Sequence, residues 1–137
     1  MNLCINQMKK LAFAFLSALL FSCTNGNNTS QSIENKVTLC PVEAYATKYG
    51  QSVKIPDLSG LPIFSVTYDS SNNNIIVRNG DRKLTLHPTQ NNNYYKSGNY
   101  GSLEYSMEAT VYNGSVSSIR YIEKEDDISV EIKYEVK

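Results

Sequence analysis

The feature that most constrains the fold is a strict alternation of apolar and polar residues near the C-terminus. Between Ile128 and Val136 every second side chain is apolar, and Ser, Glu and Lys occupy the positions between them. Residues 103–111 alternate in the same way. A period of two places all the apolar side chains on one face of an extended strand, whereas a helix would scatter them around its axis. The pattern therefore predicts half-buried β-strands.

Asn-Gly pairs connect several of these alternating runs. Asn79-Gly80 and Asn113-Gly114 each lie between two segments rich in β-forming residues. Such pairs favour the positive φ angles of type I′ turns, so we expect each pair to join two antiparallel strands. The other expected elements are strands at 52–55 and 63–68, turns at 70–74 and 124–127, and a loop at 57–62.

These runs predict an all-β fold. At least six consecutive strands are expected, each antiparallel to the one before it, in an antiparallel meander of about six to eight strands. The meander could close as a small barrel or fold as a two-layer sandwich, and both remain open from the sequence. The single helix candidate is 41–49, which has Pro41 in its first turn and ends before Gly50, with a loop as the alternative.

The N-terminus has a different pattern. Lys9 and Lys10 precede an apolar run at 11–21. A bilayer span needs about 20 apolar residues, so this run is too short to cross a membrane and has the length of a signal-peptide core instead. Met8, directly before the lysines, is a better start than Met1, which suggests that residues 1–7 are an extension of the true reading frame.

The apolar run ends at Phe21, Ser22 and Cys23, after which the chain becomes polar. This ending resembles the lipobox of bacterial lipoproteins that signal peptidase II processes, in which a small residue precedes the modified cysteine. The resemblance covers residues 8–23, and Phe21 is bulkier than the residue the family usually carries. It implies cleavage before Cys23, acyl chains such as palmitate on that cysteine, and a membrane as the first partner.

The expected organisation follows from the lipobox. Residues 1–22 form the signal peptide, residues 23–35 a lipidated flexible tether of polar residues and glycine, and residues 36–137 a β-rich domain. Thr24 is not the acidic residue that the family associates with inner-membrane retention, so the resemblance implies a lipid anchor in the cell envelope, at the outer membrane.

The charge balance argues against a nucleic-acid partner. After loss of Lys9 and Lys10, 11 of the 13 basic side chains remain beside 13 acidic ones, whereas nucleic-acid binding needs a clustered basic footprint. Cys4 also leaves with the signal peptide and Cys23 is committed to lipid, so Cys40 has no partner for an intramolecular disulfide. A buried free thiol and a reactive thiol are both open at Cys40.

No catalytic, cofactor or metal pattern stands out, so we expect a protein that is not an enzyme and needs no cofactor. His87 is the only histidine, and at a strand end we expect it on the surface rather than in a catalytic triad. Thiols and imidazoles are too few for a zinc site. The acidic segment 125–127 is expected to be a solvated turn, and 96–101 lacks the spacing of a phosphate-binding loop.

Segment 91–101 has the most unusual composition, because Tyr, Asn, Ser and Gly dominate it. These residue types resemble those of protein-binding paratopes, where tyrosine supplies contact area at low entropic cost. We expect a loop that forms part of a binding face; the alternative is an irregular connection whose tyrosines pack on the sheet. The candidate binding residues are Tyr94, Tyr95, Lys96, Ser97 and Tyr100.

A second resemblance involves the segments 84–86, 95–98, 103–105 and 108–111. Together they are similar to membrane-bound C-type lysozyme inhibitors, which are lipoproteins with a small β-barrel and a Ser- and Lys-bearing loop that enters the lysozyme cleft. The family's paired cysteines and strand tryptophan are absent. This resemblance implies an inhibitory loop that contains Lys96 and Ser97.

Three functions from different classes follow. The first is an envelope lipoprotein whose non-catalytic β-domain binds a protein or an envelope polymer such as a glycan. The second is a lipocalin-like carrier of a small ligand, which requires inward positions such as Ala109, Val116 and Val130 to leave space. The third is a hydrolase that uses carboxylates.

Overall fold

The structure is a computed structural model that describes residues 35–137. The expected signal peptide, the lipidated cysteine and all but the last residue of the expected tether lie outside the described residues. The described part contains nine strands and no helix. The strands are β1 (Asn35–Lys48), β2 (Gln51–Lys54), β3 (Phe64–Asp69), β4 (Asn74–Asn79), β5 (Arg82–Pro88), β6 (Asn93–Tyr100), β7 (Leu103–Tyr112), β8 (Ser115–Glu125) and β9 (Ile128–Val136).

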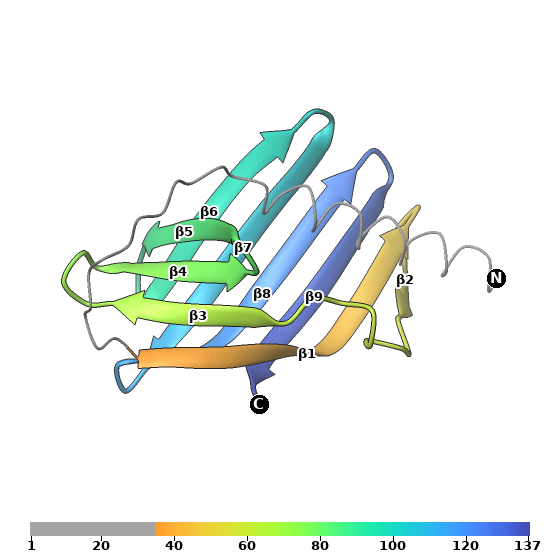
Figure 1. Ribbon diagram of the computed structural model, residues 1–137. Coiled ribbons are helices and arrows are strands. Elements are labelled where there is room, and N and C mark those ends of the chain that lie inside the picture. Colours follow the sequence, from red (N-terminus) through yellow and green to blue (C-terminus); the bar gives the residue numbers. More distant parts are fainter. Residues whose placement is uncertain (1–34) are drawn as a thin grey trace.

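The strands form an antiparallel barrel (Figure 1). Strands β3 to β9 pair in chain order, and β1 closes the circle by pairing with β3 along one edge and β9 along the other. Eight strands therefore make the barrel, and β2 is an additional strand paired with the end of β1. The predicted all-β meander is confirmed. Of the barrel and the two-layer sandwich that the sequence left open, the structure is the barrel.

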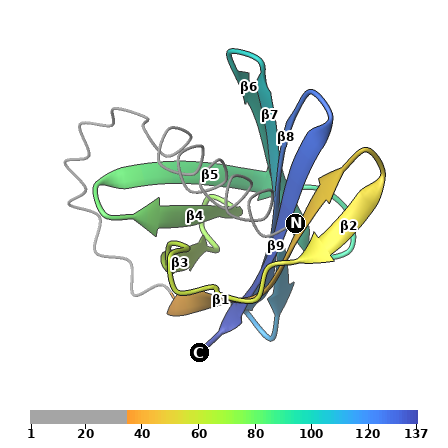
Figure 2. The same cartoon turned by 90° about the vertical axis from the view of Figure 1, so that its right-hand side faces the viewer.

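The barrel has two corners. At the first, β1 passes from β3, which pairs with residues 35–39, to β9, which pairs with residues 39–48. At the second, β5 and β6 share only two residue pairs, His87 with Tyr95 and Pro88 with Tyr94. Because of these corners, β3, β4 and β5 run across β6–β9, and one end of β6–β9 projects beyond them (Figures 1 and 2).

The helix expected at 41–49 is wrong, because residues 41–48 are the second half of β1. Seven residue pairs join this segment to β9, and this pairing overrides the weak local helix signal. The register shifts between Pro41 and Glu43, which leaves Val42 bulged and 46% exposed. Proline is tolerated at such a bulge because it has no backbone N–H to donate to the ladder.

The two Asn-Gly signals form hairpins with different turns. Asn113 and Gly114 both have positive φ, 52° and 73°, as a type I′ turn requires. At the other site Asn79 pairs with Arg82, so the turn residues are Gly80 and Asp81, and only Gly80 has a positive φ, 64°. A glycine with positive φ at the first turn position is typical of type II′, so the expected type I′ assignment is wrong there although the hairpin is confirmed.

The core lies between β3–β5 and the inner face of β6–β9. The ring of Phe64 on β3 is 4.5 Å, centroid to centroid, from the ring of Tyr134 on β9. Such tilted aromatic contacts add to the stabilisation from buried area. Ala109, Val116 and Val130, the inward positions on which the carrier hypothesis depends, are all buried in this core, at 0%, 1% and 3% exposure.

Candidate functional site

The segment 91–101, expected to be a loop of a binding face, contains strand β6, so the loop part of that expectation is wrong. Every residue from Asn93 to Tyr100 pairs with β7. Asn91 and Asn92, with φ of 58° and 61°, form the turn that precedes the strand. Asparagine, serine and glycine are poor strand formers, so the sequence of this segment does not indicate a strand. Continuous pairing with β7 stabilises the strand in spite of these low propensities.

The alternation of β6 separates the candidate binding residues. Tyr94 is only 6% exposed, and its ring meets the Tyr68 ring edge-on at 5.7 Å. The Tyr94 hydroxyl donates a 2.6 Å hydrogen bond to the side-chain oxygen of Asn73. Burial, with a contribution from the Tyr68 hydroxyl, raises the pKa of Tyr94 to about 12. Tyr94 is thus a packing residue of the core, and Lys96 shares its inward side of the strand.

The other candidates lie elsewhere on β6. Tyr95, which is 40% exposed, and Ser97 point outward, and Tyr100 is 61% exposed at the end of the strand. The lysozyme-inhibitor resemblance implied an inhibitory loop containing Lys96 and Ser97, but both residues lie in strand β6. They are consecutive strand residues, whose side chains point to opposite faces.

Outward-facing residues of β6, β7, β8, β9 and β1 form one continuous surface, called here the outer face. The strand register aligns them in rows that cross all five strands. One row is Tyr95, Glu108, Arg120, Lys133 and Glu43. The next row is Ser97, Ser106, Ile122, Glu131 and Tyr45.

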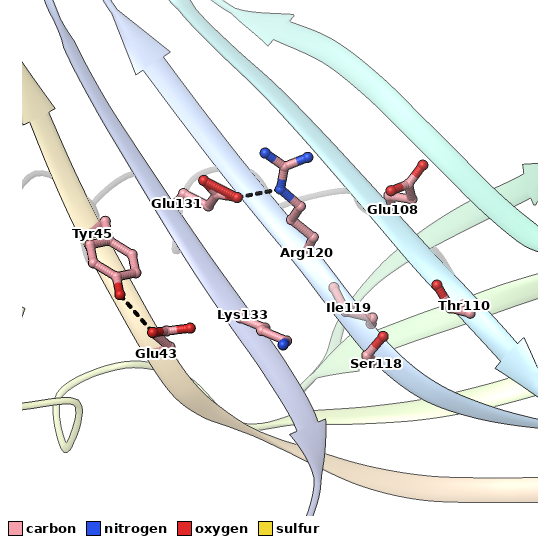
Figure 3. A pocket seen from close by; sticks show the side chains of 9 residues that line it. All are labelled: Glu43, Tyr45, Glu108, Thr110, Ser118, Ile119, Arg120, Glu131 and Lys133. Atoms are coloured by element: carbon pink, nitrogen blue, oxygen red, sulfur yellow. Dashed lines mark hydrogen bonds and ion pairs between the residues drawn. The ribbon is translucent and has the colours of Figure 1, made fainter. Parts of the chain in front are cut away.

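A hollow of about 290 Å³, called here the charged hollow, lies on the β7, β8, β9 and β1 part of the outer face (Figure 3). Its lining residues are Glu43, Tyr45, Glu108, Thr110, Ser118, Ile119, Arg120, Glu131 and Lys133. The Arg120 Nε donates to a Glu131 carboxylate oxygen, and this bond raises the pKa of the guanidinium. The Tyr45 hydroxyl donates a 2.6 Å hydrogen bond to Glu43, which raises the pKa of Tyr45.

A second hollow of about 330 Å³, called here the polar hollow, adjoins the first on β6, β7 and β8. Its lining residues are Tyr95, Ser97, Gly98, Asn99, Glu104, Tyr105, Ser106, Ile122 and Lys124. Ser106 and Glu108 are two residues apart on β7, so one strand contributes side chains to both hollows. The structure therefore brings Tyr95 and Ser97 into a site, while Tyr94 and Lys96 face the other way.

No family model, curated protein or solved structure matches this chain. The chemistry of the outer face must therefore be read from its own residues. Hydrogen-bond donors and acceptors are interspersed across it, with tyrosine rings at both margins, in Tyr95 on β6 and Tyr45 on β1. Such a surface can hold a polar ligand through many hydrogen bonds and stack a ligand face against a ring.

The remaining candidates line neither hollow. His87 is exposed at the end of β5, and Asp126 and Asp127 are exposed in the turn between β8 and β9. Cys40 is a half-buried free thiol on β1. Within residues 35–137 no group of three or more His, Cys, Asp or Glu side chains could hold a metal ion, and no helix there could cross a membrane.

Sequence reasoning missed the charged hollow. Its central residues are Arg120, Glu131 and Lys133. They occupy the polar positions of alternating strands, where side chains usually point into solvent and have no binding role. The alternation already placed them on the outward side. Their juxtaposition depends on the register of β8 against β9 and of β9 against β1, which the sequence does not reveal.

Proposed function

We propose that this chain is a lipoprotein of the bacterial cell envelope whose non-catalytic barrel binds an envelope glycan through the outer face. Acyl groups on Cys23 anchor it, at the outer membrane. The observation that carries the binding proposal is the presence of two adjoining hollows on one continuous surface of five strands.

The composition of the outer face favours a glycan over a protein partner. Protein interfaces concentrate apolar and aromatic residues at their centre and carry few charges there. Here the centre of the face is the Arg120–Glu131 pair with Lys133 beside it. Thr110 and Ser118 line the same hollow, serine and asparagine side chains line the adjoining one, and together these groups match the dense hydroxyl groups of a saccharide.

The length of the chain before the barrel suits an anchored binding domain. Strand β1 begins at Asn35, so 11 residues, 24–34, separate it from Cys23. At about 3.3–3.6 Å per residue, a fully extended segment of this length reaches roughly 40 Å. That distance lets the outer face reach polymer next to the membrane while the lipid stays in the bilayer.

Co-sedimentation with insoluble envelope polysaccharide tests this function. The full chain, held in detergent micelles, is mixed with purified peptidoglycan sacculi and, separately, with a capsular or surface polysaccharide of the same cells coupled to beads. We expect binding to at least one polymer and a loss of about tenfold or more in affinity with Arg120→Gln, because a charged hydrogen-bond donor is removed.

Arg78→Gln is the matched control, because Arg78 lies on β4, on the other side of the barrel. It should bind like the unsubstituted chain. Equal binding by the Arg120 and Arg78 variants would contradict the assignment of the outer face. Capture of a protein, with no binding to either polymer, would replace the glycan by a protein partner.

A further inference from the structure

The surface of the barrel opposite the outer face, called here the back face, is formed by β3, β4, β5 and the first five residues of β1. Phe64, Val66 and Val77 point into the core, so the residues that alternate with them point outward. The strand register aligns the outward residues in rows. One row is Thr38, Ser65, Arg78 and Lys83. The next row is Lys36, Thr67, Ile76 and Thr85.

These two rows contain three cationic side chains and no carboxylate. Lys36 is exposed, and Arg78 and Lys83 are half-buried. Arg78 and Lys83 are direct cross-strand partners, and like charges in that position destabilise a sheet. Among residues 35–137 neither Lys36 nor Arg78 forms an ion pair. Stability of the fold therefore does not explain why these cations share one surface.

The carboxylates nearest in the chain lie in the turns at the two ends of β4. Asp69, at the end of β3, accepts hydrogen bonds from Ser71 and Asn72 of its own turn. Asp81 is exposed in the turn between β4 and β5. Neither belongs to the two rows, so the middle of the back face carries positive charge alone.

The two sides of the barrel differ in charge. The segments 35–39 and 64–88, which form the back face, contain four basic and two acidic side chains. Residues 93–136, which form most of the outer face, contain eight acidic and four basic side chains. A negatively charged surface therefore attracts the back face and repels the opposite side.

The chain enters the barrel on the back face. Strand β1 begins at Asn35, directly before Lys36, and its first residues lie beside β3, on the side away from the outer face (Figure 2). The 11 residues 24–34 separate this point from Cys23. A polar coil of that length has an average end-to-end distance of roughly 18 Å. An anchor on Cys23 thus holds the back face, rather than the outer face, close to the bilayer.

We propose that the back face docks, through Lys36, Arg78 and Lys83, on the anionic phospholipid surface of the membrane that holds the Cys23 anchor. The inference rests on the proposed anchor, which makes docking an intramolecular step that a weak attraction can drive. Each lysine or arginine close to an anionic leaflet favours contact about fivefold. Docking points the outer face away from the bilayer, toward the polymer that it binds.

Paramagnetic broadening of amide NMR signals tests this orientation. The lipid-modified chain is placed in nanodiscs that contain a gadolinium-chelating lipid, made from phosphatidylcholine alone or mixed with phosphatidylglycerol. In the anionic discs we expect the amide signals of Arg78 and Lys83 to be lost and those of Glu108 and Arg120 to remain. This difference should disappear in the neutral discs, and in the anionic discs at high salt, because the attraction is absent or screened.

Two results of this measurement would overturn the proposal. The first is equal broadening of the signals from both faces in the anionic discs. The second is the same selective loss in the neutral discs, which would mean that the position of the tether, and not the charge of the back face, orients the barrel.

Two double variants separate the back face from the net charge of the chain. Lys36→Gln with Lys83→Gln should weaken docking about 25-fold and abolish the selective loss of signal. Lys48→Gln with Lys54→Gln removes the same charge from the ends of β1 and β2, outside both rows, and should retain it. Equal effects of the two double variants would overturn the assignment to the back face.

Failure of the anchor gives a different result from failure of docking. A chain that is not retained in the discs during gel filtration would contradict the proposed anchor, and the docking with it. A chain that is retained but shows no selective loss of signal would overturn the docking alone, and would leave the anchor and glycan binding by the outer face in place.

Discussion

Adjacent tyrosines on β6 show how the backbone decides the role of a side chain. Tyr94 is buried against Tyr68, while Tyr95, the next residue, lines the polar hollow on the outer face. The two have the same chemistry, and their different environments follow from the period of two in a strand. Their composition placed both in one candidate binding site, because composition does not show to which face of a strand a side chain points.

The raised pKa of Glu123 makes the stability of the barrel depend on pH. Its side chain on β8 is 2% exposed, and this burial raises its pKa from 4.5 to about 8 in the folded chain. Between these values the folded state keeps a proton that the unfolded state has lost. The free energy of unfolding is therefore highest below about pH 4.5 and falls by up to about 1.4 kcal/mol per pH unit until about pH 8.

Glu123→Gln should remove this slope, because an amide does not titrate. Urea unfolding followed by circular dichroism at pH 5, 6, 7 and 8 measures it, since a small single domain is expected to unfold in one step. Glu131→Gln, on the exposed outer face, should retain the slope of the unsubstituted chain. A slope that persists in Glu123→Gln would show that another group carries the pH dependence.

At the scale of elements, β1 and β6 are the strands that differ most from their expected form. β1 was expected to be partly helical and β6 to be a loop. Each is held by a long antiparallel partner: β1 by nine pairs with β9, and β6 by eight pairs with β7. Partners far along the chain thus override local preferences that are weak in both segments.

Leu39 marks the corner at which β1 changes partners. It pairs with Phe64 on β3 and with Val136 on β9, and its side chain is fully buried. Leu39→Ala should lower the free energy of unfolding by about 2–5 kcal/mol, because it leaves a cavity between the two parts of the barrel. Urea denaturation measures this change.

Val42→Ala is the control for the Leu39 substitution. Val42 belongs to the same strand but is 46% exposed at the bulge, so the change should stay within about 0.5 kcal/mol. Similar losses for both variants would mean that β1 contributes as a whole strand and that the corner has no special role.

At the scale of the whole molecule, closure of the barrel separates two surfaces with different chemistry. The outer face carries exposed charges and hydroxyls, while the buried side chains of the inner face are apolar or tyrosine, with the exception of Glu123. Pairing of β1 with both β3 and β9 covers one edge of each of these two strands, and open strand edges favour aggregation. A domain of this kind can stand alone on a tether.

The proposed anchor predicts where the whole molecule goes in the cell. Cys23→Ser should abolish labelling by radioactive palmitate, because a hydroxyl cannot form the thioether to diacylglycerol, and should release the domain from the membrane fraction. Cys40→Ser is the matched control and should be labelled normally. Loss of labelling in the Cys40 variant, or its retention in the Cys23 variant, would contradict the assignment of the lipid site.

The all-β class, most strand positions and the hairpin turns could be predicted from the sequence, because they depend on interactions between near neighbours. Two examples are the alternation of Ile128–Val136 and the positive φ angles that Gly114 and Gly80 allow at their turns. Closure of the barrel, the pairing of β1 with β9, the rows of the outer face and the burial of Glu123 required the tertiary structure. Each of these depends on the register between strands distant in the chain, and a shift of one residue would exchange the inner and outer faces of a strand.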